Sequence, residues 1–145
     1  MNSDLERFIT AQQRDYATAL AEVRGGCKLS HWMWYIFPQI AGLGYSSISV
    51  YYSVKSPEEA RDYLENDYLR GNLVEICRAL LALPTQNPVE VFGYIDAQKL
   101  RSSMTLFDLV ATRYAFNEVV FRQVLDRFFD GREDAATIQI LETMY

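Results

Sequence analysis

Helix-boundary signals recur along the whole chain, and they constrain its fold more than any other feature of the sequence. In the run Ser56-Pro57-Glu58-Glu59, an N-cap serine precedes a proline at the first helical position and a glutamate at the third. This combination predicts a helix that begins after Ser56 and runs to about Asn66. A polar cap before an apolar periodic stretch, with glycine or proline after it, predicts further helices in the same way.

Most of the other predicted helices combine such caps with apolar residues that repeat about every 3.6 positions. A capping box at 3–6 opens a helix that ends at the glycine pair 25–26. An apolar stripe over 69–81 predicts a central helix that ends before Pro84. The caps Asn87, Asp96, Asn117 and Asp134 predict four more helices, which end at Gly93, at about Ala111, before Gly131 and at Met144.

The segment 46–54 carries conflicting signals. Its β-branched and roughly alternating residues favour a strand by local propensity. The chain offers no second convincing strand to pair with it, and a lone strand is not stable. We therefore favour a helix, in which tertiary packing overrides propensity, and keep the strand as the alternative.

These elements predict an all-α fold, a single compact domain over residues 1–145 with six to eight helices around one core. The 145 residues are 50% hydrophobic and 14% aromatic, which excludes a disordered chain. No linker, repeat or low-complexity tract marks a boundary between two domains. The chain shows neither a leader peptide nor an apolar stretch long enough to span a bilayer, so we expect a cytoplasmic protein without a membrane partner.

Charge and metal-ligand content exclude two further classes of function. Fourteen basic and nineteen acidic residues give a net charge of −5, so we expect no nucleic-acid partner, although a local basic patch is compatible with this balance. With one histidine and two distant cysteines, Cys27 and Cys77, the chain lacks the ligands of a usual zinc site, and we predict no metal site. The cysteines are interpreted as inert small hydrophobic residues. The sequence identifies no cofactor.

The segment 28–39 is the most unusual part of the chain, because it carries both tryptophans and the only histidine. Its rings offer contact area, while the imidazole of His31 and the amide of Gln39 offer directional hydrogen bonds. An unperturbed histidine pKa of about 6.5 suits proton transfer near neutral pH. His31 is therefore a candidate catalytic residue, and its alternative role is that of a packed, hydrogen-bonded core residue.

A second segment, 96–107, supplies cations and hydroxyl groups. On a helix that begins near Asp96, the Lys99 side chain lies near the hydroxyls of the following turn. Ser103 lies within the apolar stripe of this helix, where a hydroxyl either bonds back to the previous turn or faces a polar cavity. Ser103 is the second catalytic candidate.

Together the two segments predict a pocket for a phosphorylated ligand. Cationic groups pair with phosphate oxygens, and an indole stacks on a base or sugar. The predicted ligand-binding residues are Lys28, Trp32, Trp34, Gln39, Lys99, Arg101, Ser102 and Thr105. The leading hypothesis is a small-molecule-binding protein or enzyme whose ligand is nucleotide-derived, such as an ADP-ribose-like species. No glycine-rich phosphate loop accompanies these residues.

Two alternatives to the ligand pocket follow from the same residues. The first is a non-catalytic interaction module, in which Trp32 or Trp34 belongs to an exposed aromatic patch that meets a protein partner. The second is that both segments only fill the core. The sequence does not decide whether the protein is an enzyme.

Both segments also resemble a known family. The runs KLSHWMWYIFPQ at 28–39 and KLRSSMTLF at 99–107 are similar to those of the family catalogued as domain of unknown function 1810. Its members are small proteins, found mainly in bacteria and fungi. The likeness extends to 4–8, 42–44 and 125–131, and so covers nearly the whole chain.

The resemblance implies a single, mostly helical domain and no established activity, cofactor or catalytic residue. Some members carry an automatic label of calpastatin. Calpastatin-like inhibitors are long, polar and disordered, whereas this chain is short and aromatic, so the label does not fit. The link at 112–116 departs from the family's usual short link, and contacts carried by this loop do not transfer.

Overall fold

The computed structural model describes residues 4–144, and these residues form eight helices. In chain order they are α1 (Glu6–Arg24), α2 (Met33–Ile36), α3 (Ser47–Tyr51), α4 (Pro57–Glu65), α5 (Asp67–Leu81), α6 (Pro88–Arg113), α7 (Val120–Phe129) and α8 (Ala135–Met144). Within this part of the chain the only β-type pairing is one isolated parallel bridge, between Ile40 and Val54. The predicted all-α fold is confirmed.

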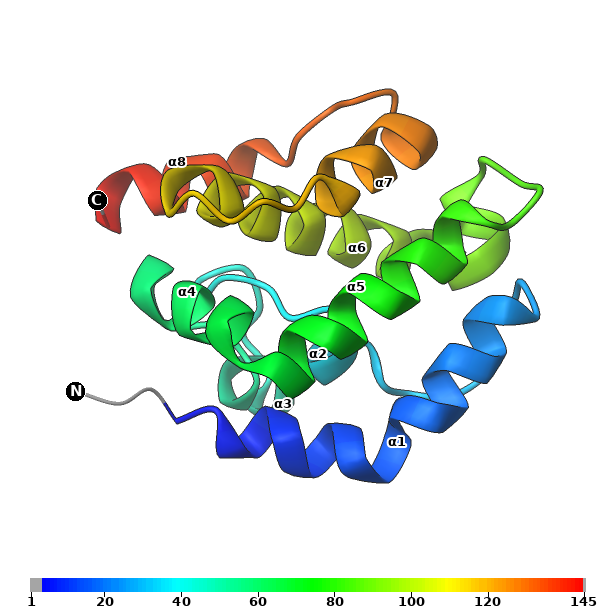
Figure 1. Ribbon diagram of the computed structural model, residues 1–145, viewed down its shortest axis with the longest axis horizontal. Helices are drawn as coiled ribbons and strands as arrows, with labels where there is room; N and C mark the ends of the chain where they lie inside the picture. Colours follow the sequence, from blue (N-terminus) through cyan, green and yellow to red (C-terminus); the bar gives the residue numbers. More distant parts are fainter. Residues whose placement is uncertain (1–3, 145) are drawn as a thin grey trace.

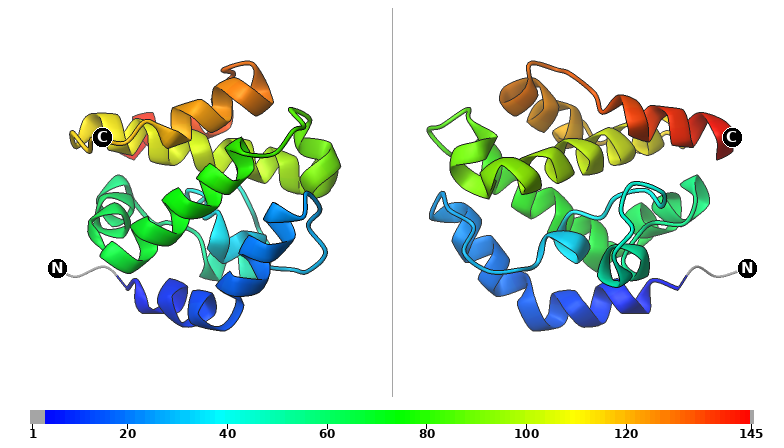
Figure 2. Two further views of the ribbon diagram at one scale, coloured as in Figure 1. Left: turned by 45° about the vertical axis from the view of Figure 1, so that its right-hand side comes forward. Right: turned by 180° about the vertical axis from the view of Figure 1, so that it is seen from behind.

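Helix α5 lies in the middle of the molecule, between α1 on one side and α6 and α7 on the other (Figure 1). Helix α4 contacts both α5 and α6, α2 packs on α1, and α8 lies beside α6, as the two turned views also show (Figure 2). The apolar stripe of α5 faces inward, and Leu69, Ile76 and Leu80 are fully buried. This confirms the predicted central helix.

The core is continuous and rich in aromatic rings. Trp32, Phe37 and Phe92 are buried together, and the centroids of their rings lie 5.9 to 6.3 Å from one another. Cys77 lies in the core and Cys27 is exposed, and both thiols are free. No helix among the described residues is both long and apolar enough to cross a membrane.

Three helix starts follow the predicted caps. The Ser56 hydroxyl accepts a hydrogen bond from the Glu59 amide at 3.1 Å, and the Asp134 carboxylate accepts one from the Thr137 amide at 3.2 Å. The side chain of Asn87 accepts in the same way at the start of α6. Each cap satisfies an amide that the first helical turn leaves without a partner, which is why these boundaries could be read locally.

Two other predicted starts are wrong. Gly93 interrupts α6 (Pro88–Arg113) with a non-helical φ of 78°, which confirms the predicted end of the short helix after Asn87. Asp96 does not cap the part that follows, and its carboxylate contacts Lys28 and Lys99 instead. Asn117 does not cap α7 either. That helix begins at Val120, whose amide donates to the Glu118 carboxylate at 3.1 Å. At α7 the Glu118 carboxylate therefore takes the role that local sequence assigned to Asn117.

The first helix begins later than its predicted capping box requires. Leu5 occupies the N-cap without a side-chain hydrogen bond, and Glu6 is the first residue of the helix. Ser3, the predicted cap, lies outside the described residues. The predicted end at the glycine pair is confirmed, since α1 ends at Arg24 and Gly26 adopts a φ of 79°.

The segment 46–54 is mostly helical, as favoured, but it also contributes to the bridge. Ser46 caps the short helix α3, and Val54 then pairs with Ile40. The segment is held by Arg7 of α1, whose guanidinium donates to the backbone oxygens of Tyr51 and Ser53. These long-range hydrogen bonds from Arg7 oppose the strand propensity of the segment.

Candidate functional site

A pocket of about 320 Å³ lies where the loop after α2 meets α6 and the start of α8. The view from behind shows this loop beside α6 and below α8 (Figure 2). Its lining residues are Trp34, Gln39, Ile40, Leu43, Gly44, Ser49, Tyr52, Ser53, Ile95, Gln98, Lys99, Ser102, Asp134 and Ala136. Four of the predicted ligand-binding residues, Trp34, Gln39, Lys99 and Ser102, are thereby brought together.

Lys99 and Trp34 form a cation–aromatic pair in the pocket wall. The Lys99 ammonium lies 5.4 Å from the centroid of the Trp34 ring and 3.5 Å from the Asp96 carboxylate. Both contacts restrain a long side chain that would otherwise move freely in solvent. The pocket therefore contains a positioned positive charge beside a flat ring.

Ser102 and Asp134 form the polar end of the pocket. The Ser102 hydroxyl lies 3.0 Å from Asp134 Oδ2 and 3.1 Å from the Gln98 carbonyl oxygen. Asp134 Oδ2 also accepts from the Thr137 hydroxyl at 2.6 Å. Because Asp134 is engaged at the start of α8, it orients Ser102, and the lone pairs of that hydroxyl stay available to a ligand.

The Gln39 side chain has unused hydrogen-bonding capacity. It is half-buried in the pocket wall, and its amide makes no hydrogen bond with the described residues. The backbone carbonyl of Gln39 is occupied, because it accepts from the Val54 amide at 2.8 Å. The backbone of Gln39 is thus fixed, and its side-chain amide has one acceptor and two donors available to a ligand.

Two predicted ligand-binding residues instead hold the fold together. The Arg101 guanidinium donates to the backbone oxygens of Arg132 and Glu133, at 2.9 and 2.7 Å. The buried Thr105 hydroxyl donates to the Arg101 carbonyl and accepts from the Asp134 amide. These contacts hold the loop before α8 against α6, so neither side chain faces the pocket.

Lys28 and Trp32 are likewise turned away from the pocket. The Lys28 ammonium lies 2.9 Å from the Asp96 carboxylate with its side chain 8% exposed, and 5.1 Å from the centroid of the Trp32 ring. Trp32 is 1% exposed, and its indole N–H donates to Glu22 at 2.9 Å. Burial therefore excludes Trp32 from the exposed aromatic patch that the alternative hypothesis requires.

The two catalytic candidates do not meet. His31 is exposed and lies outside the pocket lining. Ser103 is fully buried, and its hydroxyl has no hydrogen-bond partner among the described residues. Its hydroxyl does not bond back along the helix, and the residue that lines the pocket is the preceding one, Ser102. The structure therefore provides no geometry that joins His31 and Ser103 in one reaction.

The segment 40–53, which includes α3, is the part of the site that sequence reasoning missed. Its signal is the glycine turn at 42–44, which is too short for a dinucleotide fingerprint. A Cβ placed on Gly44 would lie 2.7 Å from the Ser49 Cβ, so the loop closes on α3 only with glycine there. A glycine that permits a close backbone approach indicates such packing, although it does not reveal what faces the other side.

Comparison with known proteins identifies the family and the fold. The family described as "Protein of unknown function (DUF1810)" matches residues 2–141. The crystal structure of the conserved hypothetical protein Rv1873 from Mycobacterium tuberculosis is similar at 38% identity, with 96% of each chain covered and a TM-score of 0.89. No functionally curated protein matches the chain.

Proposed function

From the premise that this chain belongs to the family described as "Protein of unknown function (DUF1810)", we propose that it binds a small phosphorylated molecule with a planar ring. The observation that carries the proposal is the meeting of Trp34, Gln39, Lys99 and Ser102 in one pocket. These residues come from two segments that are distant in the chain, and all four line the pocket.

Each of these side chains has a role toward such a ligand. The Lys99 ammonium pairs with a phosphate group, and the Trp34 ring covers the face of a base or sugar. The amide of Gln39 and the hydroxyl of Ser102 supply hydrogen bonds that orient the ring. A cation already held against an aromatic face loses little conformational freedom when the anion binds.

The size and charge of the pocket restrict the ligand to one ring and one phosphate. Ligand pockets range from about 300 to 1,000 Å³, and this one, at about 320 Å³, lies at the lower end. A dinucleotide would leave one half in solvent. The lining contains one cation, Lys99, and one carboxylate, Asp134, so a polyphosphate would lack counter-charges. A mononucleotide or sugar phosphate therefore fits better than an ADP-ribose-like species.

A thermal-shift titration tests this proposal. Mononucleotides, sugar phosphates and the matching unphosphorylated compounds are added to wild type, to Lys99→Met and to Arg24→Met, a control that removes a surface cation elsewhere. A ligand at a hundred times its Kd stabilises the native state by about 2.7 kcal/mol, which raises Tm by roughly 5–10 °C in a domain of this size.

We expect this shift in wild type and in the Arg24→Met control, and its loss in Lys99→Met. The phosphorylated member of each pair should give the larger shift. If no phosphorylated compound raises Tm at millimolar concentration, or if Lys99→Met responds like wild type, the proposal is wrong.

A protein-interaction role is the second candidate, favoured by apolar side chains around the mouth of the pocket. Ile95, which lines it, is 71% exposed, and Tyr94 is 72% exposed. Tyr45 is 91% exposed on the adjoining loop. These residues replace the buried Trp32 as the candidate patch. If wild type and the Tyr45→Ser/Ile95→Ser variant capture a binding partner equally well, this surface is not the interface with that partner.

A further inference from the structure

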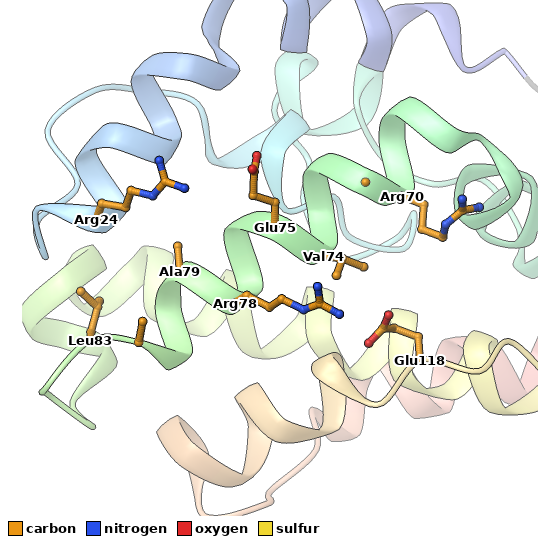
Figure 3. A pocket seen from close by; sticks show the side chains of 10 residues that line it. Arg24, Arg70, Val74, Glu75, Arg78, Ala79, Leu83 and Glu118 are labelled. Atoms are coloured by element: carbon orange, nitrogen blue, oxygen red, sulfur yellow. The ribbon is translucent and has the colours of Figure 1, made fainter.

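A second and larger concavity, of about 690 Å³, follows the outer face of α5. We call it the arginine groove, after Arg24, Arg70 and Arg78 in its lining (Figure 3). Its floor is apolar and includes Val74 and Leu83, which are 9% and 8% exposed. One wall is the end of α1, and the opposite wall is the chain just before α7.

Two of these arginines are not used by the fold. Arg24 and Arg78 are exposed, and neither makes an ion pair or hydrogen bond with another described residue. Arg70 pairs with Asp67 at 2.8 Å, but the Asp67 side chain is 94% exposed, so this pair contributes little. The guanidinium groups of Arg24 and Arg78 are therefore available to an anionic partner.

The two carboxylates of the arginine groove are already engaged. Glu75 accepts from the Tyr16 hydroxyl at 2.7 Å, and Glu118 accepts from the Val120 amide at 3.1 Å. The groove thus carries three cations and two occupied carboxylates within a chain whose net charge is −5. This local reversal of charge attracts an acidic partner and orients it on approach.

The distribution of the arginines over two helices suits an extended partner with several acidic groups. Arg70 and Arg78 lie two turns apart on α5, a separation of about 12 Å along the helix axis. Arg24 lies at the end of another helix, α1, so the three cations are distributed along the groove. The apolar floor between them offers contact area to a side chain placed between two acidic groups.

We propose that the arginine groove binds an acidic peptide segment of a protein partner. Its Asp or Glu side chains pair with Arg24 and Arg78, and an apolar side chain rests on Val74 and Leu83. A nucleic-acid strand fits less well, because its uniformly charged backbone would meet Glu75 and Glu118. The lining also contains no aromatic ring for base stacking.

Selection from random peptides displayed on phage tests this proposal and requires no assumption about which protein is the partner. The selection is run in parallel on wild type, on Arg24→Ala/Arg78→Ala and on Lys99→Met, which alters the other pocket. Both arginines are exposed and unpaired, so we expect the double variant to fold, and circular dichroism checks this. Selected peptides are then measured by fluorescence anisotropy against all three proteins, with a single-stranded oligonucleotide as competitor.

We expect peptides selected on wild type and on Lys99→Met to be richer in Asp and Glu than the starting library. Their Kd should rise by about tenfold or more in the double variant, a loss of at least about 1.4 kcal/mol, and should also rise with salt. The proposal is wrong if the selected pools show no acidic enrichment or if their affinity does not depend on the two arginines. Tighter, arginine-dependent binding of the oligonucleotide would also overturn it.

Discussion

Glu22 shows how a single side chain can position a whole segment. Its carboxylate accepts hydrogen bonds from the amides of Leu29 and Ser30, from the Ser30 hydroxyl and from the Trp32 indole. Burial alone would raise the pKa of Glu22, but these hydrogen bonds outweigh it and lower the pKa from 4.5 to about 2. The turn that leads from α1 into the aromatic segment therefore depends on an ionised carboxylate.

The Glu22→Gln variant should be less stable at neutral pH by about 2 kcal/mol, the usual contribution of hydrogen bonds to a charged acceptor. Since the pKa of Glu22 is lower in the folded state, its contribution is complete above pH 4.5 and is lost as the pH falls toward 2. Urea unfolding at several pH values measures this.

The exposed carboxylate of Glu142 provides the control, as Glu142→Gln. We expect the stability difference between wild type and Glu22→Gln to shrink as the pH falls through this range, and Glu142→Gln to follow wild type. A difference that does not change with pH would show that the hydrogen bonds of Glu22 do not depend on its charge.

Ser103 supports a second prediction at this scale. A buried hydroxyl without a partner lowers stability, so Ser103→Ala should raise the free energy of unfolding by about 1 kcal/mol. Ser102→Ala should instead lower the free energy of unfolding, because the variant lacks the hydrogen bond between the Ser102 hydroxyl and Asp134. Chemical denaturation of the two variants measures both effects. A destabilised Ser103→Ala would mean that the hydroxyl has a partner and would reopen the question of its role.

At the scale of elements, a buried ion pair joins α1 to α4 and to the wall of the pocket. Arg7 and Glu59 lie 2.7 Å apart, with side chains 4% and 8% exposed. Arg7 also donates to the Ser53 carbonyl oxygen at 2.8 Å, and Ser53 lines the pocket. The position of α3 therefore depends on a residue that is distant in sequence from the site.

Arg7→Met should destabilise the protein by about 3–5 kcal/mol, because it leaves the Glu59 charge buried without its partner. Arg7→Met/Glu59→Leu should recover part of this loss, since no buried charge remains. A double-mutant cycle by urea unfolding measures the coupling between the two residues. If the double variant is as unstable as the sum of the single variants, the ion pair is not the source of the effect.

Local sequence signals predicted some helix starts correctly and others wrongly. Ser56 and Asp134 were correct caps because their hydrogen-bond partners lie within the next turn. Asp96 has the same local appearance, but Lys28 lies 2.9 Å from its carboxylate, and that partner is on another segment. Similarly, the helix in 46–54 depends on Arg7. Propensity cannot include such long-range partners.

In the whole molecule, two concave surfaces are built on different helices. The pocket opens between α6, the loop after α2 and the start of α8, whereas the arginine groove lies on the outer face of α5. They share no lining residue, so Lys99 and Arg78 can be changed independently. This separation is why each binding experiment can use a variant of the other surface as its control.

By itself the sequence determined that the chain is helical, where several helices begin and most predicted helices end, and which stripe of α5 is buried. These properties depend on caps and periodicity, which act within a few residues. Only the tertiary structure decided that Trp34, Gln39, Lys99 and Ser102 share a pocket. In the folded protein Trp32, Arg101 and Thr105 make contacts that stabilise the fold and do not line the pocket. His31 and Ser103 lie apart. Side-chain direction depends on partners from distant segments, and folding alone brings those partners together.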